Sequence, residues 1–308
     1  MAGQGASHTD ARYSTHNNVG RDQHNCIHLQ PPPTSPKPPL SSFKFNDAPI
    51  DCLSAYFTGR EQDLDDLKNI FDSIQDNTPT RCCIHGMPGI GKTQLALRYA
   101  KLMYDQSRYE VIFWISATTL EKLNHGFAKI LNLVDHRDRD HPEQSTRLTS
   151  ARRFLEELDS VKWLLIFDNV DQSTLDFLRE HLPRNNAQGN ILFTTRTKIV
   201  ADAVVNAAGQ QHQTLELRAP NAEDAAMLLM KEAGIPSSTV AASMRRAKAL
   251  AKYVGCLPLA ISLAASFVKR SHLKNLDDLL ALYQSEHNYE VCSLYSKCSV
   301  NVHCGEFE

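Results

Sequence analysis

Four residues near position 90 have the types and the spacing of a loop that binds phosphate. Gly86, Gly91, Lys92 and Thr93 match the pattern G-x-x-x-x-G-K-[ST]. Glycines let successive backbone N–H groups turn toward a polyphosphate, and the N-terminus of the following helix adds its positive end. Lys92 would reach the β- and γ-phosphates, and the Thr93 hydroxyl would bind Mg²⁺. The segment therefore predicts a site for ATP or ADP with Mg²⁺, formed by Gly86, Met87, Pro88, Gly89, Ile90, Gly91, Lys92, Thr93 and Gln94.

An acidic residue ends a strongly apolar run further along the chain. Residues 163–167 are typical of a buried strand, and Asp168 follows them. Ligands of open α/β sheets bind at the carboxyl ends of the strands, so Asp168 is predicted to face the magnesium ion together with Thr93. Taken alone, such an Asp is more often a turn residue, and the loop upstream favours the metal role. Asp171 and Ser173 are each explained as a helix cap, and residues 173–176 match a capping box.

A third candidate group stands at the end of another apolar run. Thr194, Thr195 and Arg196 follow residues 191–193. The planar guanidinium of Arg196 is suited to pair with the oxygens of a terminal phosphate. The alternative is an arginine that simply points into solvent at the end of a strand. Lys92, Asp168 and Arg196 are the candidate catalytic residues.

The segments between these candidates indicate how they are positioned. Short apolar runs alternate with helical segments, which is typical of a parallel sheet covered by helices. One run precedes the glycine loop and a helical pattern follows it, the order that a phosphate-binding loop requires. The predicted fold class is α/β, a P-loop NTPase with five parallel strands at residues 81–85, 110–116, 162–168, 190–195 and 213–217.

Residues after 220 have a different pattern. Three segments rich in Ala, Leu and Met, at 222–233, 241–253 and 257–268, are predicted to be helices of a small all-α subdomain. The expected organisation has four parts. Residues 1–50 form a disordered polar and Pro-rich region, 51–219 the nucleotide-binding domain, 220–285 the helical subdomain and 286–308 an irregular tail.

Several features limit the partners. The 33 basic and 35 acidic residues nearly cancel, so we expect no nucleic-acid or membrane partner from the net charge. Residues 1–40 lack the apolar core of a secretory signal, and the longest apolar run, 254–268, is too short to span a bilayer, which predicts a cytoplasmic protein. The proline run at 31–39 is interpreted as a stiff spacer, with an SH3 or WW ligand as the alternative.

The eight cysteines are scattered and are interpreted as reduced thiols. Cys82 and Cys83 are adjacent on a predicted strand, so their side chains are expected to point to opposite faces of the sheet. Zinc binding by the cysteines and the histidine of residues 292–304 is disfavoured, because the spacings match none of the common zinc pairs.

Four motifs in this order resemble the NB-ARC module of signal-transduction ATPases. That family includes plant disease-resistance proteins, the apoptotic protease-activating factor and many fungal NOD-like receptors. The resemblance covers about residues 55–285 and rests on segments 86–93, 163–168, 194–196 and 255–260. It implies that the loop with Thr58, Gly59 and Arg60 lies against adenine, that Arg196 senses the γ-phosphate, and that Pro258 contacts the nucleotide.

The resemblance implies an ADP-bound switch that acts in signal transduction and innate immunity. Exchange of ADP for ATP would expose a surface for self-association or for related receptor chains. Asn169 stands where the family often has a second acid, and its amide cannot take a proton from water, so we expect at most slow hydrolysis. Family members continue into a winged-helix unit and repeats, and we expect this sequence to lack both. The alternatives are a turnover ATPase or remodelling motor, and a truncated nucleotide-binding decoy.

Overall fold

The structure is a computed structural model that describes residues 44–73, 77–206, 213–235 and 240–271. The predicted spacer, the predicted tail and the end of the predicted helical subdomain lie outside these residues.

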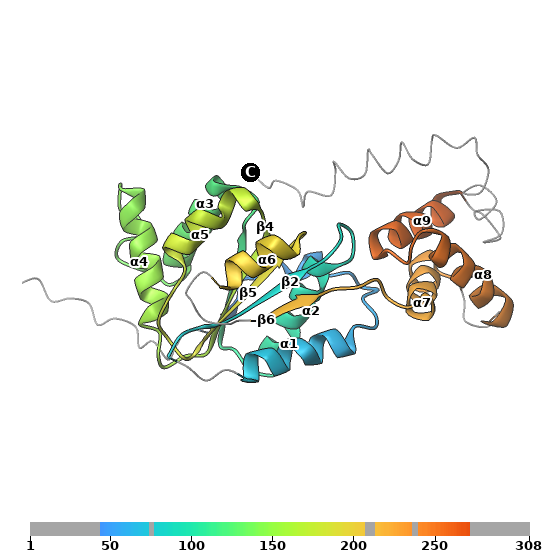
Figure 1. Ribbon diagram of the computed structural model, residues 1–308, viewed down its shortest axis with the longest axis horizontal. Helices are drawn as coiled ribbons and strands as arrows, with labels where there is room; N and C mark the ends of the chain where they lie inside the picture. Colours follow the sequence, from blue (N-terminus) through green and yellow to red (C-terminus); the bar gives the residue numbers. More distant parts are fainter. Residues whose placement is uncertain (1–43, 74–76, 207–212, 236–239, 272–308) are drawn as a thin grey trace, which may run out of the picture. The chain divides into compact units, whose positions relative to one another are not determined.

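A six-stranded parallel sheet forms the centre of the nucleotide-binding unit, with strand order β1-β3-β4-β5-β2-β6 (Figure 1). The predicted fold class is confirmed, with one strand more than expected. All five predicted strands are present within one or two residues of their expected ends. The strands are β1 (Phe45–Asn46), β2 (Thr80–His85), β3 (Val111–Ser116), β4 (Trp163–Val170), β5 (Gly189–Thr195) and β6 (Gln213–Glu216).

The additional strand β1 lies inside the segment that was expected to be disordered. Phe45 pairs with Val111 at the edge of the sheet. The Oδ2 atom of the next residue, Asp47, accepts a hydrogen bond from Trp114 N at 3.3 Å. Its Oδ1 forms an ion pair with Lys129 Nζ at 2.6 Å. The ordered domain therefore includes residues 45–50. Two residues are too few to show an alternating pattern, so this edge strand depends on contacts from distant parts of the chain.

Helices cover both faces of the sheet (Figure 1). One apolar core lies between the sheet and helices α1 (Glu61–Ser73) and α2 (Lys92–Asp105). The other lies under four helices: α3 (Leu120–Leu133), α4 (Gln144–Glu156), α5 (Leu175–His181) and α6 (Lys198–Val205).

Cys82 and Cys83 contribute to different cores, which confirms that they point to opposite faces. Burial raises the pKa of Cys82 to about 12 and raises that of Cys83 as well. Both thiols are therefore unreactive packing groups in the folded protein.

The helical unit consists of α7 (Ala222–Ala233), α8 (Val240–Tyr253) and α9 (Pro258–Ser271), each close to its predicted range. Their inward faces share a core of small and aliphatic side chains. Asn221 starts α7 because its side-chain oxygen accepts hydrogen bonds from Glu223 N and Asp224 N, both at 2.9 Å. Gly234 ends the helix with φ of 71°.

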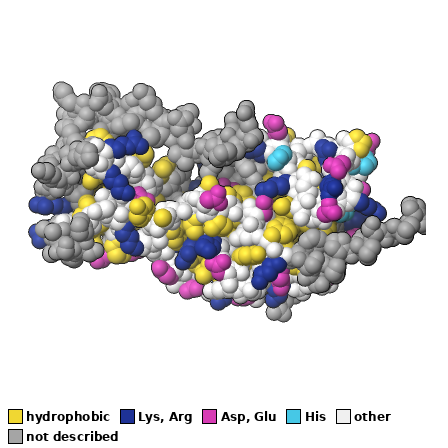
Figure 2. All heavy atoms as spheres, turned by 180° about the vertical axis from the view of Figure 1, so that it is seen from behind, with side chains coloured by type: hydrophobic (Ala, Val, Ile, Leu, Met, Phe, Trp, Pro, Cys, Tyr) yellow, Lys and Arg dark blue, Asp and Glu magenta, His cyan; other side chains and the backbone are white. Residues whose placement is uncertain are grey.

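The described surface does not carry one dominant charge. Figure 2 shows basic and acidic side chains interspersed over the face that it presents. Among the helices of the described residues, none is long and apolar enough to cross a membrane.

Candidate nucleotide-binding site

The loop between β2 and α2 depends on glycines for its shape. Gly86, Gly89 and Gly91 have φ values of 152°, 77° and 98°. Residues that carry a Cβ rarely adopt such angles. A Cβ on Gly86 would lie 2.6 Å from the carbonyl oxygen of Leu217. The same Leu217 donates its N–H to His85 O at 2.8 Å. The start of the loop therefore lies against the chain that follows β6.

Lys92 lies across this loop at the first position of α2. Its Nζ donates to Gly86 O at 2.8 Å and to Met87 O at 3.0 Å. Burial lowers its pKa, and the nearby charge of Arg196 lowers it further. No side chain caps α2, whose N-cap residue is Gly91. The N-terminal amides of the helix therefore have no side-chain cap and lie beside a cationic group, an arrangement that suits an anion.

Asp168 and Thr93 meet at the carboxyl ends of the strands, as predicted. The Thr93 hydroxyl donates to Asp168 Oδ1 at 2.9 Å and lies 3.2 Å from Oδ2. Thr194 donates to Oδ1 at 2.6 Å. Burial raises the pKa of Asp168, while the hydrogen bonds from Thr194 and Thr93 act in the opposite direction. The cluster offers the hard oxygen ligands that Mg²⁺ prefers.

The residues after β4 turn away from regular strand geometry. Asn169 has φ of 61°. Asp171 accepts from Ser173 N at 3.1 Å and from Ser173 Oγ at 3.0 Å, and it forms a capping box with Thr174 at the 3₁₀ helix η3 (Gln172–Thr174). The predicted cap at Asp171 is confirmed. The predicted box starting at Ser173 is wrong, because the 3₁₀ turn places the cap two residues earlier.

Arg196 follows β5 and is exposed. Its charge adds to the effect of burial, which is the main cause of the lowered pKa of Lys92. It also adds a smaller effect to that of the Ser173 hydrogen bonds, which lower the pKa of Asp171 most. The structure therefore places all three predicted catalytic residues, Lys92, Asp168 and Arg196, at the same edge of the sheet.

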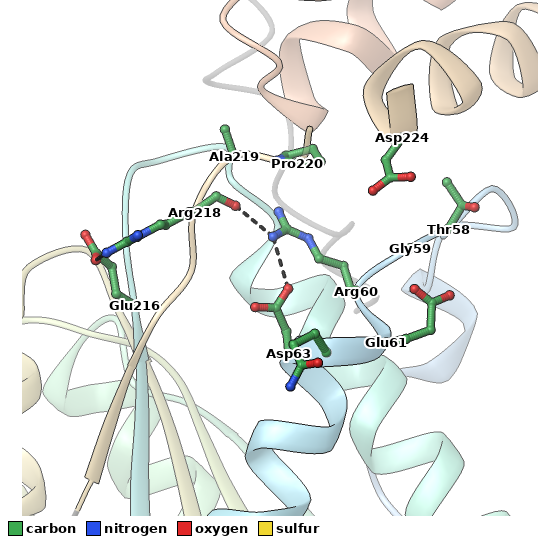
Figure 3. Close-up of a pocket in the computed structure, with 11 residues that line it drawn as sticks. Thr58, Gly59, Arg60, Glu61, Asp63, Glu216, Arg218, Ala219, Pro220 and Asp224 are labelled. Carbon is green, nitrogen blue, oxygen red and sulfur yellow. Dashed lines mark hydrogen bonds and ion pairs between the residues drawn. The ribbon is translucent and has the colours of Figure 1, made fainter. Parts of the chain in front are cut away.

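The predicted adenine loop is tied to the phosphate loop through Arg60. Its guanidinium donates to Ile90 O at 3.1 Å, to Arg218 O at 2.7 Å and to Asp63 Oδ2 at 3.2 Å. Figure 3 shows the Arg60 side chain reaching the segment after β6 at Arg218, in the wall of a pocket of about 340 Å³. No phosphate-loop residue lines this pocket. Its lining residues are Thr58, Gly59, Arg60, Glu61, Gln62, Asp63, Glu216, Arg218, Ala219, Pro220 and Asp224.

Gln94 was predicted to contact the nucleotide, but its side chain is engaged elsewhere. Its amide nitrogen donates to Cys52 O at 2.9 Å, and its amide oxygen accepts from Ser54 N at 2.8 Å. This two-point contact fixes the segment that leads to Thr58 onto helix α2. The structure therefore assigns the Gln94 amide a positioning role in the described chain.

Pro258 and Leu259 bring the start of α9 to the phosphate loop. The Pro258 ring lies 4.0 Å from the position that a Cβ on Gly91 would take. Leu259 donates its N–H to Gly89 O at 3.2 Å, and its Cβ lies 3.1 Å from the position of a Cβ on Gly89. Pro258 was predicted to contact the nucleotide, and its position beside Gly91 is compatible with that prediction. The contact of Leu259 with the loop was not predicted.

These groups fit a nucleotide with Mg²⁺. Lys92 and the uncapped N-terminus of α2 suit phosphates, and the Thr93 hydroxyl and the Asp168 carboxylate suit the metal. The loop, Lys92, Thr93 and Asp168 come together as predicted. The sequence analysis named Thr194 only as part of the strand end with Arg196 and missed its hydrogen bond to Asp168. It also missed the contact of Leu217 with the loop.

Comparisons with known proteins agree with this geometry. The sequence profile described as "NB-ARC domain" matches residues 60–238. A "Nucleotide-binding leucine-rich repeat (NLR)-like protein" of Hyaloscypha variabilis is 27% identical over 247 residues, which are 74% of this chain and 24% of the relative. "Disease resistance protein RPP13" of Arabidopsis thaliana is 26% identical over 153 residues, 46% of this chain and 18% of the relative. This chain thus spans about a quarter or less of these relatives.

Solved structures share the fold. The ORC2 protein of Aeropyrum pernix, solved as ADPNP-ADP complexes, has a TM-score of 0.53 at 14% identity and covers 79% of this chain and 73% of its own. A Walker-type ATPase of Pyrococcus abyssi has a TM-score of 0.51 at 8% identity, with coverage of 85% and 80%. At these identities the likeness concerns the fold alone.

Proposed function

Because the chain belongs to the NB-ARC family, as the match over residues 60–238 shows, we propose that it is an ADP/ATP-dependent signalling switch with at most slow ATP hydrolysis. The family and the P-loop NTPase fold imply a bound nucleotide, typically with Mg²⁺. The observation that carries the proposal is the hydrogen bond of 2.9 Å from the Thr93 hydroxyl to Asp168 Oδ1. It lies beside the glycine loop and Lys92.

The chain's own residues divide the work of holding the nucleotide. Lys92 would exchange its two loop carbonyls for phosphate oxygens, and the α2 amides would bind the same phosphates. Thr93 and Asp168 would hold Mg²⁺, which offsets the charge of the phosphates. The loop with Thr58, Gly59 and Arg60 and the ring of Pro258 would enclose the base, and Arg196 would respond to a γ-phosphate.

The switch differs from a turnover enzyme in its water-activating group. Asn169 follows Asp168 and has no basic oxygen that takes a proton. Asp171 is the next carboxylate, and it is engaged as the cap of η3. The residues beside the predicted Mg²⁺ ligands therefore support binding and exchange of the nucleotide more than its rapid hydrolysis.

We expect wild-type turnover below roughly 1 s⁻¹, the lower end of ordinary enzymes. Asn169→Asp should raise it by roughly 100-fold, the lower end of what a positioned base contributes. Phosphate release under saturating ATP measures both rates, and Asn169→Ala is the matched control, since it changes the same left-handed position without adding a base. A wild-type rate well above this limit would favour the turnover ATPase or motor instead.

The switch itself is tested by the nucleotide that accompanies the purified chain. Extraction and chromatography should recover close to one ADP per chain. Loading with a non-hydrolysable ATP analogue should then increase the mass measured by light scattering, because the proposed ATP form associates with itself or with related chains. Recovery of empty protein that hydrolyses ATP rapidly would reject the switch. The family names of the relatives support a role in innate immunity, and we propose a cytoplasmic location for that role.

A further inference from the structure

We propose that Thr194 is a positioning residue for the metal-binding carboxylate, and that its hydroxyl sets how tightly Mg²⁺ holds the nucleotide. The inference rests on the proposed function of the site. It concerns a side chain that would not touch the ligand itself, but that holds Asp168 in place from the neighbouring strand.

The hydroxyl of Thr194 has only one possible direction for its proton. Thr194 is 1% exposed, so water does not compete for its bonds. Its Oγ1 accepts a hydrogen bond from Asn169 N at 2.8 Å and lies 2.6 Å from Asp168 Oδ1. Since the amide N–H can only donate and an ionised carboxylate can only accept, the Thr194 proton must point to Asp168.

A bulge in β4 makes this arrangement possible. Phe167 pairs with Phe193 and Val170 pairs with Thr195, so two residues of β4 stand opposite Thr194 alone. The unpaired residue of a bulge leaves its N–H outside the ladder. Here the N–H of Asn169 is satisfied by the Thr194 hydroxyl, which therefore ties the bulge and the carboxylate to one point on β5.

The two hydroxyls that donate to Asp168 come from different secondary-structure elements. Thr93 belongs to the first turn of α2 and is itself a predicted metal ligand, so its oxygen must serve the ion. Thr194 belongs to a central strand, paired on both sides by β4 and β2. It is therefore the rigid partner of Asp168, in the way that groups behind metal ligands orient them.

Thr195 provides a matched comparison on the same strand. Its hydroxyl is buried as well and donates to Val170 O at 2.8 Å, next to the same bulge. Asp168 is not among its partners. Replacing either threonine by valine removes one buried hydroxyl with almost no change in shape, but only Thr194→Val removes a bond to the carboxylate.

The test measures the affinity for a fluorescent ATP analogue in EDTA and across a Mg²⁺ titration. Thr194→Val should raise the Mg²⁺ concentration needed for half of the affinity gain by about tenfold, the lower range for such partners of metal ligands. Affinity in EDTA should stay unchanged. Thr194→Ser and Thr195→Val should both keep the wild-type magnesium dependence, and Asp168→Asn should lose it.

The other outcomes reject either the role of Thr194 or the metal site itself. A wild-type magnesium dependence in Thr194→Val, with loss in Asp168→Asn, overturns the role of Thr194. An equal loss in Thr195→Val reduces both threonines to packing of the bulge and also overturns it. Retained dependence in Asp168→Asn rejects the metal site of the proposed function. Thermal unfolding without nucleotide monitors folding, and Thr194→Cys, with a weak sulfur donor, replaces the valine variant if that does not fold.

Discussion

Replacement of Lys92 by Met is expected to lower the affinity for ATP and ADP by at least about 100-fold. Each hydrogen bond from a charged donor contributes about 1.5–3 kcal/mol, and loss of two such bonds to phosphate amounts to about 3 kcal/mol, or roughly 100-fold in affinity. Met keeps the buried stem of the side chain and removes only the ammonium. Isothermal titration calorimetry with ADP and with ATP measures the change.

The matched control is Lys101→Met in the same helix. The Lys101 side chain is partly exposed and pairs with Asp105, so its loss should leave nucleotide affinity unchanged. In the absence of ligand, Lys92 also holds the loop through Gly86 O and Met87 O, so a small loss of thermal stability is expected in Lys92→Met alone. Wild-type affinity in Lys92→Met would reject the phosphate site.

Replacement of Gly86 by Ala is expected to destabilise the fold by about 2–4 kcal/mol, the range for a strained backbone combined with a buried clash. The added Cβ would meet the backbone oxygen of Leu217 at 2.6 Å. A backbone atom within a paired segment cannot rotate away, so either β6 or the loop must shift. Denaturant unfolding measures the loss, and nucleotide titration should show weaker binding at the same time.

Gly234→Ala separates the clash from the strain of a positive φ. Gly234 has φ of 71° at the end of α7, and nothing lies within 4 Å of the position of a new Cβ. Its replacement should cost about 1 kcal/mol, the backbone contribution alone. Equal losses in the two variants would show that contact with Leu217 does not matter.

The long elements of this fold were predictable because each one carries its own pattern. The apolar runs that became β2 to β5 are mostly buried, and the order of the strands around the glycine loop predicted the edge where Asp168 meets Thr93. Periodicity also placed α7 to α9 within a few residues. These features depend on local sequence.

The features that were missed depend on contacts between distant residues. Strand β1 is only two residues long and is held by the Lys129–Asp47 ion pair. The amide of Gln94 bonds a segment about forty residues earlier. The bulge at Asn169 has no sequence signature beyond the tolerance of Asn for positive φ. A single sequence does not predict such contacts, because the residue types around one position do not indicate which distant residue it will contact.

The strand order has a consequence for the synthesis of the chain. Strand β2, which leads into the phosphate loop, takes its partners only from β5 and β6 within the described sheet. Its first pair joins Thr80 to Asn190, about 110 residues later, which at translation rates of about 5–20 residues per second is a delay on the order of ten seconds. During that interval Cys82 and Cys83, which are fully buried in the finished protein, lack the strands β5 and β6 that pair with their own.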